Sequence, residues 1–160
     1  GGPVGDRALS RRLPADPELR ALLGDARTIA VVGLSSKPWR PSHRVASYLK
    51  RRGYRIVPVN PNEREVLGEP AYPSLEDVPP DVRIDVVDVF RRPEHAPELA
   101  RQAARVGARV LWLQAGVVSE EAARIAEAAG LSVIMGACIH EELLRLDEEA
   151  GGSTAQGTEG

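Results

Sequence analysis

Five short apolar runs, rich in β-branched residues, are spaced along the chain and restrict it to few fold classes. They cover residues 29–32, 56–59, 84–90, 110–113 and 131–135. Near-continuous apolar runs of this length are typical of strands buried on both faces, as in a parallel sheet covered by helices. We therefore expect five buried strands rather than a sheet with one solvated face.

Amphipathic stretches separate several of these runs. Apolar residues recur at helical spacing in two of them, at Ala96, Leu99, Ala100 and Ala103 and at Ala122, Ile125, Ala126 and Ala129. Three of the expected helices end at a glycine, and a strand follows at once after Gly53, Gly107 and Gly130. Because glycine accepts the left-handed conformation that ends a helix, this repeat indicates right-handed βαβ units.

The alternation predicts an α/β fold: a single Rossmann-like three-layer domain with five mainly parallel strands in the order 3-2-1-4-5. This order puts the second strand inside the sheet, where Pro58 would remove a donor from the ladder, so we expect Pro58 at a bulge or a frayed end. The domain is predicted over residues 16–148, with a flexible N-terminus over 1–15. A disordered tail is predicted over 149–160, since its last ten residues include nothing apolar larger than Ala.

Composition and charge argue against several classes of function. A net charge of −2 gives no general attraction to nucleic acid or anionic membranes, and 4% aromatic residues argue against a base-stacking single-strand binder. One cysteine excludes an intrachain disulfide, and no Cys/His spacing indicates a metal site. No apolar run approaches about 18 residues, so we expect no membrane span. The single cysteine favours a reducing cytoplasm, and we expect a monomer or homodimer there.

The predicted fold also predicts where a ligand binds. An open α/β sheet binds ligands beyond the carboxyl ends of its strands, at the point where the strand order reverses. In the expected order this crevice lies between the first and fourth strands. The segments that would line it are 33–42, 60–61, 90–92, 114–116 and 136–138.

The loop over residues 33–42, Gly-Leu-Ser-Ser-Lys-Pro-Trp-Arg-Pro-Ser, carries groups suited to phosphate. Gly33 permits a sharp turn and a close ligand approach, while Lys37 and Arg40 supply cations. Ser42 is expected to cap the following helix, whose free amides and dipole favour an anion. The alternative interpretation is a polar connecting loop with solvated charges.

Two features argue against a nicotinamide dinucleotide. The fingerprint Gly-x-Gly-x-x-Gly would need glycines at the positions of Ser35 and Pro38. The second strand is followed by Asn60 and Pro61 rather than by an acid that could hold a ribose diol. An NAD(P)-binding oxidoreductase on a degenerate Rossmann loop is therefore kept as an alternative.

Five segments together resemble the stand-alone CoA-binding proteins of the YccU type, which are similar to the CoA-binding domain of the succinyl-CoA synthetase α subunit. These segments are 29–35, 40–42, 53–61, 86–93 and 112–116. The resemblance implies that the chain binds coenzyme A or an acyl-CoA as a non-catalytic or regulatory protein. A further alternative is a CoA-responsive partner subunit of an acyl-CoA enzyme.

The resemblance also implies a role for each matching position. The CoA phosphates would be held by Gly33, Ser35, Lys37, Arg40, Pro41 and Ser42. Asn60 and Pro61 would flank the nucleotide, Phe90 and Arg91 would border the adenine, and Gln114, Ala115 and Gly116 would close the floor. No residue is expected in a catalytic role, and no metal is expected.

The segment over residues 135–142 departs from this family, whose members carry Asp-Arg where Gly136 and Ala137 stand. Two interpretations of Cys138 stand: a thiol that forms a mixed disulfide with CoA, and a small core residue. Trp112 is expected in the core, while Trp39 is expected on the ligand loop, where it could shield the site.

Overall fold

The computed structural model describes residues 11–159, with side chains through Gly151, around a five-stranded parallel sheet. The strands are β1 (Thr28–Val32), β2 (Arg55–Val59), β5 (Val86–Val89), β6 (Val110–Leu113) and β7 (Ser132–Ile134), in the order β2-β1-β5-β6-β7. The predicted α/β class and the five parallel, Rossmann-like strands are confirmed.

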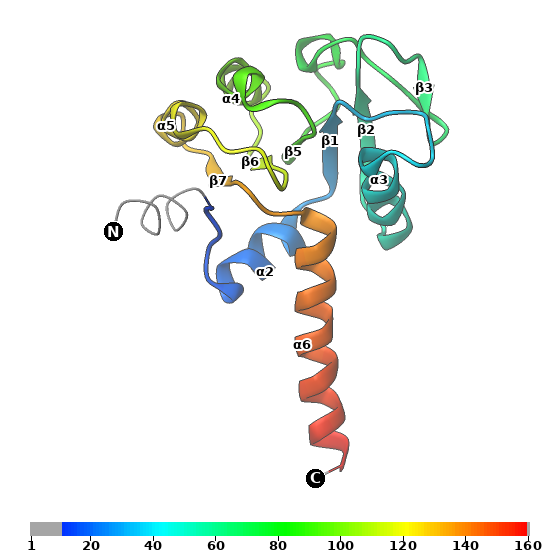
Figure 1. Ribbon diagram of the computed structural model, residues 1–160, viewed down its shortest axis with the longest axis vertical. Helices are drawn as coiled ribbons and strands as arrows, with labels where there is room; N and C mark the ends of the chain where they lie inside the picture. Colours follow the sequence, from blue (N-terminus) through cyan, green and yellow to red (C-terminus); the bar gives the residue numbers. More distant parts are fainter. Residues whose placement is uncertain (1–10, 160) are drawn as a thin grey trace.

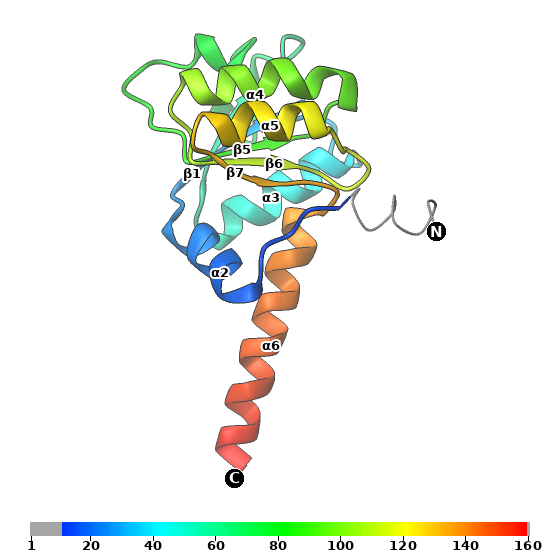
Figure 2. The ribbon, with the colours of Figure 1, turned by 90° about the vertical axis from the view of Figure 1, so that its left-hand side faces the viewer.

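Helices cover both faces of the sheet (Figure 1, Figure 2). One face carries α2 (Asp16–Asp25), α3 (Pro41–Arg52) and α6 (Ile139–Glu159), and the other carries α4 (Ala96–Arg105) and α5 (Glu120–Ala128). Alternate residues of each strand enter the two cores, so that Ile29 packs on the α2, α3 and α6 side and Ala30 on the other. Two buried faces explain why the strands are continuous apolar runs.

The strand order differs from the predicted 3-2-1-4-5. After β2 the next strand of the sheet, β5, is added on the far side of β1 rather than beyond β2. The connection from β2 to β5 contains an antiparallel hairpin, β3 (Glu65–Val66) with β4 (Glu69–Pro70), and the short 3-10 helix η1 (Leu75–Asp77). Its buried residues Leu75, Val78 and Ile84 join the core on the α4 and α5 side. A right-handed crossover on that face returns past β1, so β5 pairs with β1 rather than extending the sheet beyond β2.

Pro58 lies in regular register opposite Val31, not at a bulge or a frayed end. In the observed order β2 is an edge strand, a position that tolerates proline. The carbonyl oxygen of Pro58 accepts a hydrogen bond from Tyr72 N–H (3.0 Å) on the side away from β1. Since the N and C=O of one strand residue point to the same side, the missing N–H removes no bond to β1.

The N-terminal end of the described residues is attached to the sheet. Arg12 exchanges two backbone hydrogen bonds with Met135 (2.9 and 3.0 Å), so residues 11–15 belong to the packed part of the chain. Residues 1–10 of the predicted flexible N-terminus lie outside the described residues. The backbone of α6 is helical to Glu159, and the predicted disordered tail stays a prediction because its side chains beyond Gly151 are not described. Within residues 11–159 no helix is both long and apolar enough to cross a membrane.

Candidate functional site

Gly33 shapes the turn after β1 and lies directly against the end of β5. Its φ is +88°, and a Cβ built there would lie 2.6 Å from the Phe90 carbonyl oxygen and 3.2 Å from Cδ of Arg91. Glycine is the residue that tolerates this φ at so short a distance. Its N–H donates to Val59 O (2.8 Å), so Gly33 joins the carboxyl ends of β1, β2 and β5.

The point where the strand order reverses therefore lies between β1 and β5. This corrects the predicted position between the first and fourth strands. The loop after β1 and the segment after β5 lie next to each other at this point, because Gly33 closely approaches Phe90 and Arg91. Phe90 is half-buried there, and its N–H donates to Val32 O (2.9 Å).

The loop between β1 and α3 satisfies several of its own amides. Ser42 Oγ accepts from Ser35 N–H (3.0 Å), and Ser35 Oγ accepts from Lys37 N–H (3.1 Å). Ser42 is buried, and α3 begins at Pro41 with Arg40 as an N-cap that makes no side-chain cap bond. The prediction that Ser42 caps α3 is wrong, because its hydroxyl holds the preceding loop in shape.

The segment after β2 is tied to this loop by Asn60. Its Nδ2 donates to Leu34 O (3.0 Å), while its Oδ1 accepts from Asn62 N–H (2.9 Å). Glu63 follows, and its Oε2 accepts from Ser36 N–H at 2.7 Å. An acid therefore does reach the loop, although none follows β2 directly. Sequence reasoning missed Glu63, since no motif marks that position.

Four cationic side chains gather on the two walls of the crevice. Lys37 and Arg40 are exposed on the first loop, and Arg91 and Arg92 follow β5. None of them takes part in the ion pairs formed among residues 11–151. Unpaired cations next to the N-terminal end of α3 favour an anion at this place.

Gln114, the first residue after β6, is buried and caps α6. Its Oε1 accepts from Ile139 N–H (3.1 Å), and its own N–H donates to Val89 O (3.3 Å). The predicted floor of the crevice is thus also a brace between β5 and α6. Ala115 and Gly116 are exposed on the turn that follows, and among residues 11–151 no hydrogen bond joins them to the loop at Gly33.

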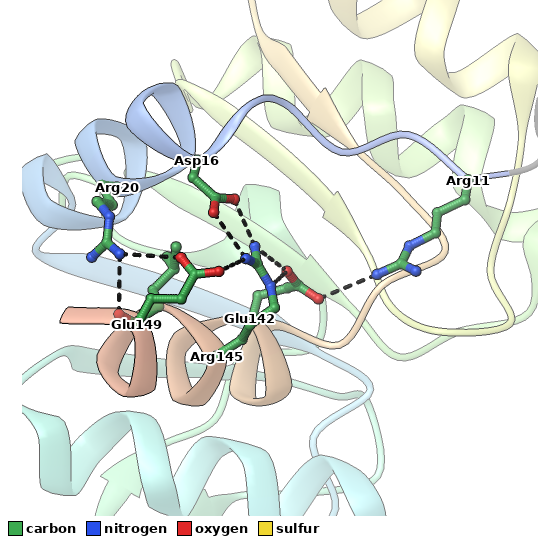
Figure 3. A network of polar contacts seen from close by, with 7 residues as sticks. Arg11, Asp16, Arg20, Glu142, Arg145 and Glu149 are labelled. Atoms are coloured by element: carbon green, nitrogen blue, oxygen red, sulfur yellow. Dashed lines mark hydrogen bonds and ion pairs between the residues drawn. The ribbon is translucent and has the colours of Figure 1, made fainter. Parts of the chain in front are cut away.

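A network of ion pairs fixes the first turns of α6 against α2 and the segment before it (Figure 3). Arg145 makes two hydrogen bonds to the Asp16 carboxylate (2.9 and 3.0 Å) and also contacts Glu142 (2.9 Å). Glu142 is buried and accepts from Arg11 as well (3.2 Å). The hydrogen bonds from Arg145 lower the pKa of Asp16 below its ordinary value, so this pairing stabilises α6.

A carboxyl group, that of Asp88, lies in the middle of β5. It is fully buried opposite Val31 and Trp112 on the neighbouring strands, and neither oxygen has a hydrogen-bond partner in the described part of the chain. Burial raises the pKa of Asp88 well above its ordinary value, so the group favours its neutral form. In the sequence, Asp88 could have been singled out as an acidic residue inside the apolar run over residues 84–90.

The residues that precede and open α6 do not assemble a metal site. Cys138 is partly exposed, packed against the core on the α2, α3 and α6 side. The His140 ring stacks on Tyr48 with ring centroids 3.9 Å apart, and desolvation lowers the pKa of His140. In the described residues no three His, Cys, Asp or Glu side chains gather as a metal site would require.

Two surface hollows lie away from the crevice. One, of about 300 Å³, opens at the amino ends of β5, β6 and β7 and includes Asp85 and Arg109, whose charged groups are 3.7 Å apart. The other, of about 440 Å³, follows the outer edge of β7 beside Leu13 and Pro14. Neither includes a residue of the loop at Gly33, and the Asp85–Arg109 pair joins the starts of two strands. We place the candidate site at the carboxyl ends of the strands, because the Gly33 turn and the unpaired cations lie there.

Comparison with known proteins agrees with the fold. A family model described as "CoA binding domain" matches residues 27–143. The uncharacterized protein YneT of Bacillus subtilis (strain 168) is 43% identical over 126 residues, which cover 79% of this chain and 92% of that protein. A solved structure of a hypothetical protein from Pyrococcus horikoshii OT3 superposes with a TM-score of 0.80 at 40% identity, covering 83% of this chain and 92% of that one.

A longer enzyme also matches. The acetate–CoA ligase (ADP-forming) II of Archaeoglobus fulgidus is 31% identical over 113 residues, which cover 69% of this chain and 16% of the ligase. The chain therefore corresponds to a small part of that enzyme.

Proposed function

Because the chain belongs to the family of CoA-binding domains, we propose that it binds coenzyme A or an acyl-CoA at the carboxyl ends of β1, β2, β5 and β6. The observation that carries this proposal is the Gly33 turn, whose backbone is pressed against Phe90 and is followed by a cationic loop. Such a turn brings loop amides and a helix N-terminus to one point, where a phosphate can be held.

The charges around the loop fit this ligand. Coenzyme A carries a diphosphate and a 3′-phosphate, so it presents several negative charges along its nucleotide. Lys37 and Arg40 are exposed on the loop after β1, and the partly exposed Arg91 follows β5; none of them has an acidic partner among the described side chains. Ser35 and Ser42 support this ligand indirectly, because their hydroxyls fix the loop on which the cations stand.

The proposed role is binding without a reaction. Among the described residues, neither the loop after β1 nor the segment after β5 brings together a nucleophile and a base, and the fully buried carboxyl of Asp88 lies inside the sheet. The NAD(P)-dependent oxidoreductase is the less favoured alternative, since Ser35 and Pro38 occupy the places of two fingerprint glycines. A CoA-responsive partner of an acyl-CoA enzyme is a second role compatible with the same site.

Calorimetric titration with CoA, NAD and NADP tests the ligand class. We expect CoA to bind and the two dinucleotides to bind weakly or not at all. Trp39 gives an independent signal, because it is 67% exposed on the loop whereas Trp112 is fully buried. CoA should therefore change the tryptophan emission of the native protein and leave that of Trp39→Phe nearly unchanged. Tight NADP binding without CoA binding would overturn the proposal.

A matched pair of variants tests the location. Arg40 and Arg55 are both exposed and lack acidic partners in the described region, but Arg55 lies at the amino end of β2. Arg40→Ala is expected to weaken CoA binding about tenfold at low salt, as loss of one close cation–phosphate contact would. Arg55→Ala should change it less than about twofold, since its charge is distant and screened. Equal losses would place the ligand elsewhere.

A further inference from the structure

Glu63 places a carboxylate in a loop that otherwise presents cations, and the proposed function leaves this group unused. Its Oε2 accepts from Ser36 N–H at 2.7 Å, a distance typical of a charge-assisted hydrogen bond. The neighbouring amides of Ser35 and Lys37 donate to serine hydroxyls of the same loop. Of these three consecutive amides, Ser36 alone donates to a charged group from another segment.

The three amides differ in how easily a ligand can use them. The acceptor of Ser35 N–H is Ser42 Oγ, which is buried and fixed at the start of α3. The acceptor of Ser36 N–H is the end of a partly exposed glutamate side chain, which can rotate away. Ser36 N–H is therefore a loop amide that a phosphate can reach, provided that it displaces the Glu63 carboxylate.

The displaced carboxylate would stay close to the ligand. The backbone of Glu63 is held because its N–H donates to Asn60 O (3.2 Å), and Asn60 Nδ2 is bound to Leu34 O. Two anions then compete for one donor and repel each other beside it. The strength of phosphate binding at this loop therefore depends on Glu63 as well as on the cations.

We propose that Glu63 is an internal competitor for phosphate at Ser36 N–H and sets how tightly the loop holds a phosphorylated nucleotide. This inference rests on the proposed function, in which CoA binds at this loop. It assigns Glu63 to ligand selectivity: a phosphate at Ser36 is penalised, while a ligand without phosphate is unaffected.

Calorimetry with CoA, dephospho-CoA and adenosine on three variants tests this role. Glu63→Gln keeps an acceptor oxygen for Ser36 N–H but removes the charge, and Glu63→Asp keeps the charge but shortens the reach. Glu65→Gln is the control, because Glu65 is exposed on β3, two residues from Glu63, and its side chain forms no hydrogen bond or ion pair with the loop in the described part of the chain. Urea denaturation of each variant confirms that it folds like the native protein.

Glu63→Gln is expected to bind CoA about tenfold more tightly, the gain of one uncontested charge-assisted hydrogen bond, with a smaller gain for Glu63→Asp. This increase in CoA affinity should persist at about 0.5 M salt, because a direct contact is little screened. Glu65→Gln should change CoA binding less than about twofold, and adenosine binding should be equal in all four proteins. Dephospho-CoA shows which phosphate competes, since a gain confined to CoA assigns the 3′-phosphate.

Two results would overturn the inference while leaving the proposed function intact. Equal gains for Glu63→Gln and Glu65→Gln would show a general charge effect, and weaker CoA binding by Glu63→Gln would make Glu63 a direct ligand contact, such as an acceptor for ribose hydroxyls. Absence of CoA binding by the native protein and by every variant would instead overturn the proposed function, and this inference with it.

Discussion

Substitution of Gly33 by alanine tests whether the turn after β1 needs a residue without a side chain. An alanine Cβ would lie 2.6 Å from the backbone oxygen of Phe90, which cannot move without disturbing β5. A φ of +88° costs an alanine about 1–2 kcal/mol, and overpacking against a fixed atom costs about 1–3 kcal/mol more. We therefore expect Gly33→Ala to lower the free energy of unfolding by about 2–5 kcal/mol.

Gly130→Ala is the matched control for this substitution. Gly130 has a φ of +92°, but a Cβ built there meets no atom within 4 Å, and it lies at the opposite ends of the strands. Gly130→Ala should lower the free energy of unfolding by about 1–2 kcal/mol, which is the conformational cost alone. Urea denaturation with unchanged m-values gives both free energies. If the two variants lose the same stability, the close approach of Gly33 to Phe90 does not constrain the turn.

Three further substitutions test other parts of the account. Asp88→Asn should leave stability unchanged near pH 4 and raise it increasingly at higher pH. The reason is that an acid whose pKa in the folded state exceeds its unfolded value of 3.8 destabilises the fold as pH rises from that value toward the folded pKa. Thermal melts between about pH 4 and pH 9 measure this difference, and a difference independent of pH would contradict it. Arg145→Gln should lower stability at neutral pH, and the difference should shrink as pH falls below about 4, since the lowered pKa of Asp16 gives stability that is lost on protonation; a difference constant with pH would exclude this pairing as its cause. Ser42→Ala should cost about 1–3 kcal/mol by leaving Ser35 N–H without its acceptor, and it should weaken CoA binding through loss of loop order; unchanged values in denaturation and calorimetry would refute the role given to this hydroxyl.

The sequence predicted the elements of the fold well because each depends on local chemistry. The run at 110–113 coincides with β6, and the stripe from Ala96 to Ala103 is the buried face of α4. The turn glycines Gly53, Gly107 and Gly130 all adopt positive φ, although the last two follow the C-cap residue rather than occupy that position. Periodicity and glycine conformation are short-range properties, so they can be read without the tertiary structure.

The strand order could not be predicted in the same way. It depends on which face of the sheet the connection over residues 62–83 crosses, and that segment has no helical period to show its buried side. The burial of Leu75 and Val78 in the core beside α4 shows which face the connection crosses, and this burial is known only from the structure. Pro58 was a usable signal, because a proline in the second strand favours an edge position.

The candidate site was predicted as a set of segments but not as a set of contacts. Gly33, Asn60 and Phe90 do meet at the carboxyl ends of neighbouring strands. Ser42 and Gln114 are predicted to contact the ligand, and the structure adds that their side chains hold the loop and the start of α6. Each of these contacts is a single hydrogen bond whose partner depends on how the loop or the neighbouring strand folds, and no sequence pattern encodes it.

Amide NMR spectra recorded during a titration with CoA test the central claim most directly, because they locate the ligand without any substitution. If CoA binds at the crevice, the largest shifts should fall on Gly33, Ser36 and Phe90, with little change at Arg109 and Ser132 on the opposite edge. Shifts concentrated at Arg109 and Ser132, or no shifts at millimolar CoA, would contradict the account.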